Sequence, residues 1–392
     1  MIANVVHTSL NARGGGERLS IATIKALSAM GAEVELATVE EPDMALIRDA
    51  YGTSIDRDVK RIRTLSLFQE HEGSPGFTIN THGDMLPFFR RNFTKNNAIT
   101  YCHYPIAGHL MDCGDPDYAG VLQNMCLSST VPECRGAHAE VARSAYGKMM
   151  KNSTVLTNSE FSRRAIFKTF GVDPTVLHPP VDTDAFRTAL SSECRDDSII
   201  VISRFHPSKK IENAVRLARL LRQNDLGSRM NIVGNMSPDG AGYFNYLRHL
   251  VRRYGLDDFV RFEVNAKFDR LLGLMRRSKV YVHPLPGEPF GISTVEAMSA
   301  GIIPVVPDIG GHTEFVPAKY QFHTFGQGVE AVAAALGAPA SERAQMSHLT
   351  HQYSTANYIK KFQQIAARVF EISRPLEPAP VISVSKRPEP AA

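Results

Sequence analysis

The chain has 392 residues, of which 43% are hydrophobic and 21% are charged, a composition typical of a globular protein with two or more domains. The formal net charge of +4 comes from 44 basic and 40 acidic residues, a balance that does not by itself indicate nucleic-acid binding. Residues 1–186 carry a net charge of −3 and the remainder +7. The basic second half suits an anionic ligand there, although solvated surface lysines explain it equally well.

The five cysteines form no C-x-x-C pair, and their number is odd, so we expect a reducing compartment and no disulfide framework. They are Cys102, Cys113, Cys126, Cys134 and Cys194. A zinc site built from Cys113, Cys126 and Cys134 would lack the close ligand pairs usual for that metal, and we expect no metal. No apolar segment reaches transmembrane length, and the N-terminus has no signal-peptide pattern. The expected location is cytoplasmic, with the cytoplasmic face of a membrane as a possible site.

Short apolar segments alternate with helical patterns in the first half, which predicts βαβ units around a parallel sheet. The expected strands cover residues 2–8, 34–39, 77–81, 98–104 and 154–158, and a helix opens at Gly14–Gly16 and runs to about Met30. Between Tyr104 and Tyr146 glycines and prolines weaken the pattern. We expect an irregular insertion there, near the carboxyl end of a strand, where α/β proteins bind ligands.

The alternation restarts after a predicted linker at residues 177–184, where two consecutive prolines stop both helix and sheet. Strands are expected at 198–204, 230–234, 260–264, 280–284 and 302–306, with helices at 210–222, 243–254, 268–277, from about 293, and at 356–372. The predicted fold is α/β, with two Rossmann-like doubly wound domains that face each other across a cleft. Their predicted ranges are 1–178 and 179–355, followed by a C-terminal helix at 356–373 that packs back on the first domain and a Pro-rich disordered tail at 374–392.

The segment GEPFGISTVEAMSAG, residues 287–301, places Glu288 before a Phe-Gly turn and Glu296 within the helix that follows. The N–H groups of Phe290, Gly291 and Ile292 are expected to point out of the helix start, where free amides and the helix dipole favour an anion. The two carboxylates could accept hydrogen bonds from hydroxyl groups on either side of that anion. An anion flanked by two hydroxyl-bearing groups describes a nucleotide sugar, although an isolated pair of glutamates at this spacing is more often an ordinary helix surface.

Basic residues gather after the first strand of the second domain, at Arg204, Lys209 and Lys210. Lysines at a helix start are unfavourable beside the helix dipole unless an anion lies there. A guanidinium and an ammonium could neutralise a diphosphate without a metal. Two solvated lysines are the alternative.

Two features of the first domain complete the candidate site. Gly15 and Gly16 would let a backbone approach a diphosphate or sugar, although a plain loop is equally compatible and the G-x-G-x-x-G dinucleotide pattern is not met. His103 ends an expected strand and could hydrogen-bond the transferring sugar, whereas a lone histidine is more often structural. Tyr101 and Tyr104 could shape the acceptor side or simply pack in the core.

The segment EPFG…EAM…GIIPVV resembles the E-x7-E signature of retaining glycosyltransferases of family GT4, which have the GT-B fold. SRFHPSKK, GGGE, HPPVD and GGHTE are similar to further elements of that family in order and position, and YCHYP and GGGE look closest to mannosyltransferases that extend lipid-linked oligosaccharides. The resemblance covers nearly the whole chain except the tail.

This resemblance implies an enzyme that transfers a hexose, mannose favoured, from a nucleoside-diphosphate sugar, GDP-mannose favoured, to a glycan or lipid-linked acceptor hydroxyl. His103, Arg204, Lys209 and Glu288 would be catalytic, and Lys210 and Glu296 would bind the donor with the glycine loop and the helix start. The departing phosphate would help to deprotonate the acceptor, with retention of configuration and no metal.

Other functions remain open on the sequence. A Rossmann oxidoreductase predicts a dinucleotide fingerprint that is missing. A non-catalytic partner subunit predicts loss of Arg204, Lys209, Glu288 or Glu296, all of which are present. A nucleotide-sugar epimerase on the same fold stays an alternative. Peripheral membrane contact would suit a lipid-linked acceptor. The basic clusters near Arg90–Arg91, Lys148–Lys151 and Arg163–Lys168 are candidates for it, and solvated faces explain them as well.

Overall fold

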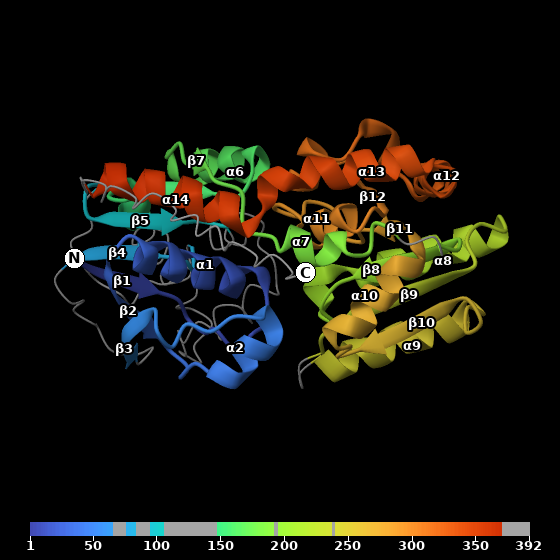
Figure 1. The fold of residues 1–392 in the computed structure, drawn as a ribbon. Coiled ribbons are helices and arrows are strands. Elements are labelled where there is room, and N and C mark those ends of the chain that lie inside the picture. The colour runs from blue at the N-terminus through green and yellow to red at the C-terminus, as the bar shows by residue number, and fades with distance from the viewer. Residues whose placement is uncertain (66–75, 84–94, 106–146, 192–194, 237–239, 371–392) are drawn as a thin grey trace, which may run out of the picture.

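The computed structural model describes residues 1–65, 76–83, 95–105, 147–191, 195–236 and 240–370. These residues form two α/β units side by side (Figure 1). The expected insertion between Tyr104 and Tyr146, the expected tail, the cysteines proposed for zinc and the pair Arg90–Arg91 lie largely or wholly outside the described residues.

The first unit is built on a parallel sheet of seven described strands in the order β3-β2-β1-β4-β5-β6-β7. The strands are β1 Ile2–Val6, β2 Glu33–Thr38, β3 Val59–Thr64, β4 Phe77–Asn80, β5 Ala98–Tyr101, β6 Thr154–Thr157 and β7 Thr175–Val176. The described helices of this unit are α1 Gly15–Ala29, α2 Met44–Tyr51 and α6 Glu160–Phe170. The strand order reverses direction between β1 and β4, which is the position where open α/β sheets form a crevice at their carboxyl edge.

The second unit has a parallel sheet of six described strands in the order β10-β9-β8-β11-β12-β13. The strands are β8 Ser198–Ile202, β9 Arg229–Gly234, β10 Val260–Val264, β11 Ser278–Val282, β12 Ile303–Pro307 and β13 Gln321–Phe322. Its α-helices are α7 Thr183–Arg187, α8 Ile211–Gln223, α9 Ala241–Arg253, α10 Phe268–Arg277, α11 Ile292–Ser299, α12 Phe325–Leu336 and α13 Ala340–Leu349, with short 3₁₀ turns η2 Pro207–Lys209, η4 Gly311–Glu314, η5 Ala318–Tyr320 and η6 Thr350–Tyr353. The switch between β8 and β11 repeats the arrangement of the first unit.

The last described helix, α14 Thr355–Val369, returns from the second unit and lies across the first (Figure 1). Its buried side chains Tyr358, Phe362 and Ala366 join the core beneath α1, and the Tyr358 hydroxyl lies 2.7 Å from the Thr23 hydroxyl. The chain therefore passes between the two units twice. The two passages run side by side, because Val181 and Ser354 form a parallel β-bridge.

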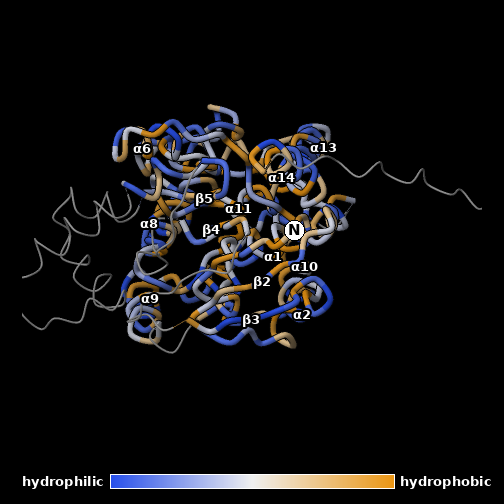
Figure 2. Tube along the Cα trace, turned by 90° about the vertical axis from the view of Figure 1, so that its left-hand side faces the viewer, coloured by the Kyte–Doolittle hydropathy of each residue, from blue (hydrophilic) through white to orange (hydrophobic). Residues whose placement is uncertain are grey.

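The hydrophobic pattern explains these elements. Apolar residues follow the strands and the inward faces of the helices (Figure 2). In α1, Leu19, Ile24 and Leu27 are completely buried, while Glu17 caps the helix start. Separate clusters of buried residues on the two sheets give each unit its own core.

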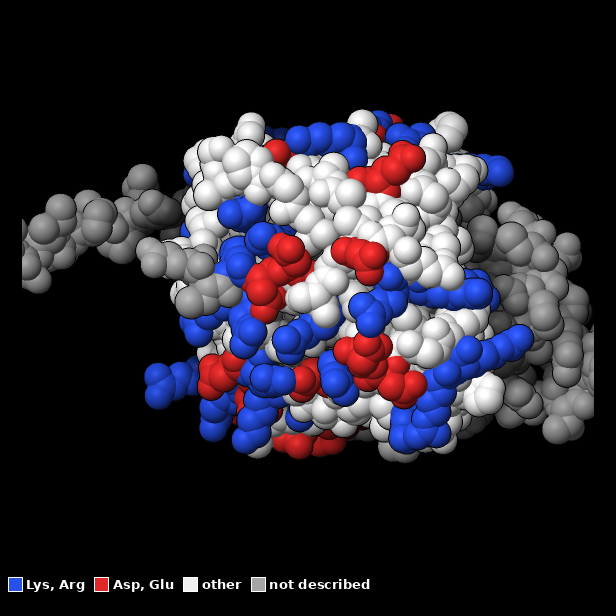
Figure 3. Space-filling view, turned by 90° about the vertical axis from the view of Figure 1, so that its right-hand side faces the viewer, with Lys and Arg blue, Asp and Glu red and all other residues white. Residues whose placement is uncertain are grey.

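The second unit does not present a single basic surface at its outer end. Basic and acidic side chains are intermingled there (Figure 3). Four ion pairs of this unit are Arg222–Asp258, Arg270–Glu263, Arg277–Asp196 and Lys279–Asp197. Among the described helices, none combines the length and apolar character that a membrane span requires.

Candidate active site

The turn between β11 and α11 is held against a second turn that follows β12. Gly291 has φ +96°, and Gly310 has φ +131°, conformations that favour glycine. The N–H of Gly311 donates to the Glu288 carbonyl over 2.8 Å, and a Cβ on Gly311 would overlap the Pro289 carbonyl. These contacts fix the backbone from Glu288 to Gly291 at the carboxyl edge of the second sheet.

The start of α11 offers donor groups to the space between the two units. Among the described residues, none accepts a hydrogen bond from the backbone N–H of Phe290, Gly291 or Ile292. The Phe290 side chain is buried against His178 and Tyr353, so only its backbone can serve a ligand. Unpaired N–H groups at a helix start, together with the helix dipole, make a site that attracts an anion.

Glu288 is held by two basic side chains from neighbouring elements. Its Oε2 lies 3.0 Å from Lys209 Nζ and 3.4 Å from His283 Nε2, and the other ring nitrogen of His283 lies 2.7 Å from the Tyr281 hydroxyl. Burial alone would raise the pKa of the Glu288 carboxyl, but Lys209 and His283 outweigh it and hold the pKa well below its usual range. Glu288 is therefore an ionised hydrogen-bond acceptor at neutral pH and is unsuited to act as a general acid.

Glu296 lies within α11, one turn after its first residue, Ile292, and is 8% exposed. Its Oε1 is 3.4 Å from Nη2 of Arg18, which belongs to α1 in the first unit. Burial raises the pKa of the Glu296 carboxyl, and Arg18 opposes that rise. The pKa values of the two predicted glutamates are thus shifted in opposite directions. Two neighbours, Lys209 and His283, lower the pKa of Glu288, whereas Arg18 alone opposes the effect of burial on Glu296.

The glycine loop of the first unit meets the start of α11. A Cβ on Gly15 would overlap the Cδ1 of Ile292, and a Cβ on Gly16 would lie 3.8 Å from Nε2 of His103. Glu17 accepts a hydrogen bond from the N–H of Gly14 over 2.8 Å and so shapes the loop. The predicted glycines therefore allow α1 and α11 to approach with their N-termini facing the same space.

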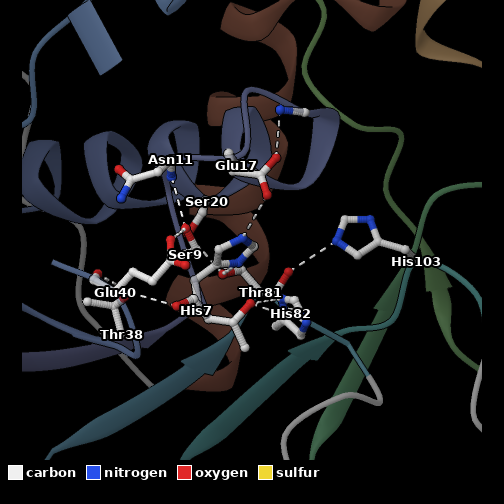
Figure 4. A network of polar contacts seen from close by, with 12 residues as sticks. His7, Ser9, Asn11, Glu17, Ser20, Thr38, Glu40, Thr81, His82 and His103 are labelled. Atoms are coloured by element: carbon white, nitrogen blue, oxygen red, sulfur yellow. Dashed lines mark hydrogen bonds and ion pairs between the residues drawn. The ribbon is translucent and has the colours of Figure 1, made fainter. Parts of the chain in front are cut away.

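A polar network lies under this loop at the carboxyl ends of β1, β4 and β5 (Figure 4). The Thr81 hydroxyl is its centre, 3.0 Å from His7 Nδ1 and 2.9 Å from the Ser20 hydroxyl. Nε2 of His7 lies 3.7 Å from Glu17 Oε1. Burial raises the pKa of Glu17, but His7 and the Gly14 N–H outweigh it and bring the pKa to about 2.

His103 is fixed in one tautomer by this network. Its Nε2 lies 3.1 Å from the Thr81 carbonyl, which can only accept, so Nε2 carries the proton and Nδ1 is the acceptor of the neutral ring. Burial lowers the pKa of His103 to about 4 despite that hydrogen bond. Burial likewise lowers the pKa of the adjacent His82 to about 3, with His7 and His103 contributing. Both rings are neutral at physiological pH.

The basic residues after β8 are not all in one place. The strand ends at Ile202 rather than at Arg204, which lies exposed in the following loop, and no described carboxylate forms an ion pair with it. Lys209 ends the turn η2, and Lys210 has φ +50° and begins α8 with its side chain exposed. The structure thus joins Lys209 directly to the α11 side of the site and leaves Arg204 and Lys210 at its edge.

The two tyrosines predicted for the acceptor side differ. Tyr101 is 1% exposed, and its hydroxyl donates to the Leu177 carbonyl over 2.7 Å, so of the two roles that the sequence left open it has the one in the core, behind His103. A buried strand position with its own carbonyl acceptor explains the difference. Tyr104 is partly exposed and stacks on Phe161 of α6, with ring centroids 5.8 Å apart.

The two units also touch beside the site. The Ser159 hydroxyl donates to the Pro289 carbonyl over 2.6 Å. The Glu314 carboxylate accepts from the N–H groups of Glu160 and Phe161, over 3.1 and 2.7 Å, at the start of α6. The turn that carries Pro289 is therefore tied to the first unit on one side, as α11 is through Arg18 on the other.

The second unit matches a known family. Residues 182–347 match the family described as Glycosyl transferases group 1. This segment, the greater part of the second unit, is therefore similar to group 1 glycosyltransferase domains. It contains every second-unit residue of the site, including Lys209, Glu288 and Glu296.

Solved structures share the fold over almost the whole length. The chain superposes on sucrose-phosphate synthase from Thermosynechococcus elongatus with a TM-score of 0.66 at 16% identity, covering 95% of this chain and 100% of that one. For Anabaena HepE in complex with UDP and glucose the TM-score is 0.64 at 15% identity, covering 94% and 99%. The predicted GT-B fold, with two Rossmann-like domains, is confirmed.

Curated relatives match part of the chain. A GDP-Man:Man(3)GlcNAc(2)-PP-Dol alpha-1,2-mannosyltransferase of Dictyostelium discoideum is 30% identical over 38% of this chain and 31% of its own. The protein of that name in Neurospora crassa is 27% identical over 58% and 46%. A D-inositol 3-phosphate glycosyltransferase 2 of Catenulispora acidiphila is 26% identical over 40% of both. The chain thus spans less than half the length of these relatives.

Several residues around the glycosyltransferase domain were missed by sequence reasoning. Arg18 follows the predicted glycine loop. It is a basic residue near a helix start, which is the same signal by which Lys209 and Lys210 were predicted. His7 and Thr81 end predicted strands, as His103 does, but no pattern singled them out. Ser159 and Glu314 act between units, which no local pattern shows.

Proposed function

We propose that the chain is a retaining hexosyltransferase that moves a hexose, with mannose favoured, from a nucleoside-diphosphate sugar to a hydroxyl of a glycan or lipid-linked acceptor. The observation that carries the proposal is the start of α11, whose free N–H groups lie between the carboxylates of Glu288 and Glu296 and face the glycine loop of α1. In this proposal the diphosphate binds those N–H groups, and the two carboxylates accept hydrogen bonds from the sugar and the ribose.

The geometry supports a division of tasks around the reacting bond. The acceptor oxygen bonds to the anomeric carbon as the bond to the departing phosphate oxygen breaks, and the acceptor proton passes to that phosphate. Lys209 keeps N–H donors beyond the one directed at Glu288, and with Arg204 and the α11 amides it would stabilise the phosphate charge. The acceptor nitrogen of neutral His103 would receive a hydrogen bond from a sugar hydroxyl.

Retention is proposed without a carboxylate nucleophile. A glycosidase of retaining type uses one carboxylate as nucleophile and one carboxylic acid as proton donor. The low pKa of Glu288 and its ion pair with Lys209 leave it no proton to donate. We propose that no metal takes part, and that GDP-mannose is the favoured donor, in keeping with the activity for which the mannosyltransferase relatives are named.

A thermal-shift panel with GDP-mannose, UDP-glucose, UDP-N-acetylglucosamine, GDP, UDP and NAD⁺ tests the proposal. A ligand that binds the folded state raises the melting temperature. We expect one nucleotide series to raise it in the wild type and not in Glu296→Ala. The matched variant Glu330→Ala, an exposed glutamate on α12, should respond like the wild type. A response to NAD⁺ alone, or to none of these compounds, would overturn the proposal.

Contact with a membrane surface is a separate part of the proposal. Phe167 on α6 is 58% exposed, and the exposed Arg164 and Lys168 flank it. Arg163, by contrast, is engaged by Glu160 and Asp173. We expect binding to phosphatidylcholine vesicles only when phosphatidylserine is added, and weaker binding by Phe167→Ser. Equal sedimentation of both proteins with either vesicle would contradict it.

A further inference from the structure

Arg18 occupies an unusual position for a basic residue. It is the fourth residue of α1, so it lies in the first turn, where the helix dipole disfavours a positive charge. Its guanidinium reaches out of the first domain toward the second, where Nη2 lies 3.4 Å from Oε1 of Glu296. That distance describes an ion pair rather than a close hydrogen bond.

The guanidinium has unused hydrogen-bonding capacity. Its Nη1 is buried and has no hydrogen-bond partner among the described residues. Arginine does not lose its charge in proteins, so a buried donor of this kind remains costly until an acceptor meets it. The side chain is 23% exposed, which leaves it open to a ligand in the space between the domains.

The surroundings hold the guanidinium in place. Its Cζ lies 5.9 Å from the centre of the Tyr51 ring, and the Tyr51 hydroxyl donates to the Gly14 carbonyl over 3.0 Å. This ring therefore ties Arg18 to the glycine loop that it follows. Such a contact orients a guanidinium without consuming its N–H donors.

The charges nearby point to an anion. One turn before Arg18, Gly15 packs on Ile292 at the start of α11, where N–H groups are free. Glu288 already pairs with Lys209, so its charge is matched within the second domain. A phosphate at the α11 start would lie in reach of the helix amides on one side and of Arg18 on the other.

We propose, building on the function proposed above, that Arg18 is a donor-binding residue supplied by the first domain. Its guanidinium donates hydrogen bonds to the diphosphate of the nucleotide sugar while Glu296 holds the ribose. The ribose replaces Arg18 as the partner of the Glu296 carboxylate, and the guanidinium turns to the adjacent phosphate oxygens. The donor is thereby bound by both domains. The two domains would therefore close when the diphosphate is bound.

Calorimetric titration of the full chain with GDP, UDP, guanosine and uridine tests this inference. The readout is the affinity for a nucleoside diphosphate divided by the affinity for its nucleoside. We expect Arg18→Gln to lower this ratio by about 10-fold to 100-fold, because a hydrogen bond to a charged group is lost. Arg48→Gln removes an exposed arginine of α2 that pairs with Asp56, and it should leave the ratio unchanged.

Arg18→Lys covers the case in which Arg18→Gln does not fold, since it keeps the charge and loses the planar fork. We expect it to lower the ratio by a smaller factor. An unchanged ratio in a folded Arg18 variant would overturn the inference and leave the transferase proposal standing. Loss of diphosphate and nucleoside affinity by the same factor would show that Arg18 acts on the ribose or the cleft instead. If the wild type binds none of the four compounds, both proposals fall.

Discussion

The two walls of the candidate site are chemically different. The wall from the first domain is a network of imidazole rings and hydroxyls, in which His7, Ser20 and His103 all bond to Thr81 and the ionised Glu17 lies beside His7. The wall from the second domain combines ionised side chains with free backbone N–H groups, at Lys209, Glu288 and the start of α11. Arg18 is the exception, a charge that the first domain sends across to the second.

This difference separates two kinds of recognition. A neutral histidine with a fixed tautomer offers one acceptor in one direction, which suits a sugar hydroxyl. Ionised groups and helix amides suit a phosphate, because they act on charge as well as on geometry. On the proposed function, changes to the second wall should affect the chemical step and donor affinity most, and changes to the first wall should affect the sugar alone.

The largest effect is expected from Lys209→Ala. It removes a cation from the proposed phosphate site and leaves the partly buried Glu288 with His283 as its remaining basic neighbour. We expect kcat to fall by about 100-fold to 1000-fold, as for other losses of a group that stabilises developing charge. Steady-state transfer assays measure it. Lys319→Ala, which removes an exposed lysine paired with Glu342, should keep wild-type kcat, and a comparable loss there would refute the assignment.

The substitution His103→Gln tests the proposed role of the first wall. The glutamine amide can still donate to the Thr81 carbonyl, but the ring nitrogen that we propose accepts from a sugar hydroxyl is lost. We expect kcat to fall by about 10-fold, with unchanged affinity for a nucleoside diphosphate. Because the pKa of His103 is about 4, this ring stays neutral as pH falls to about 5, and only below that does its protonation remove the acceptor. Exposed His323→Gln is the control, and weakened diphosphate binding in His103→Gln would contradict a sugar-specific role.

The opposite pKa shifts of the two glutamates predict a pH dependence of donor affinity. Burial raises the pKa of Glu296, so its carboxylate gains a proton as pH falls through that raised value, while Glu288 stays ionised. We expect nucleotide affinity to fall below the raised pKa, approaching about tenfold per pH unit, and to recover as pH rises. Titration across mildly acidic pH measures this. In Glu296→Gln the dependence should be absent, and a dependence that persists there would assign it to another group.

The smallest effect is expected where the walls are tied together. Glu314→Gln keeps an oxygen that can accept from the start of α6 but removes the negative charge that complements the helix dipole. We expect a loss of about 1 kcal/mol in stability and a lower melting temperature. Calorimetry measures it against Glu330→Gln, an exposed substitution on α12. An unchanged melting temperature would mean that this contact adds nothing to the packing of the domains.

Much of the fold could be predicted from the sequence because local patterns determine it. The strand at residues 260–264 and the helix at residues 268–277 have the predicted bounds, since each is a short periodic segment between clear turns. The edge strands Val59–Thr64 and Thr175–Val176 were missed. The first is rich in arginine and lysine, and the second has only two residues, so neither shows a strand pattern.

The site could be predicted only where one segment carries it. The α11 turn holds Glu288, Gly291 and Glu296 within nine residues, so its motif was visible in the sequence. The partner of Glu296 is Arg18, which is far away in the chain and meets it only when the domains pack. The sequence left the role of Tyr101 open for the same reason, because its carbonyl acceptor Leu177 comes from a distant segment.

The return of α14 to the first domain bears on how the protein is made on the ribosome. The side chains of Tyr358, Phe362 and Ala366 complete the core beneath α1, yet they are translated after the whole second domain. The nascent first domain must therefore wait with an uncovered apolar surface until residues 355–369 leave the exit tunnel. A messenger RNA truncated in the codons for α14 would leave the second domain complete but deprive the first domain of part of its core.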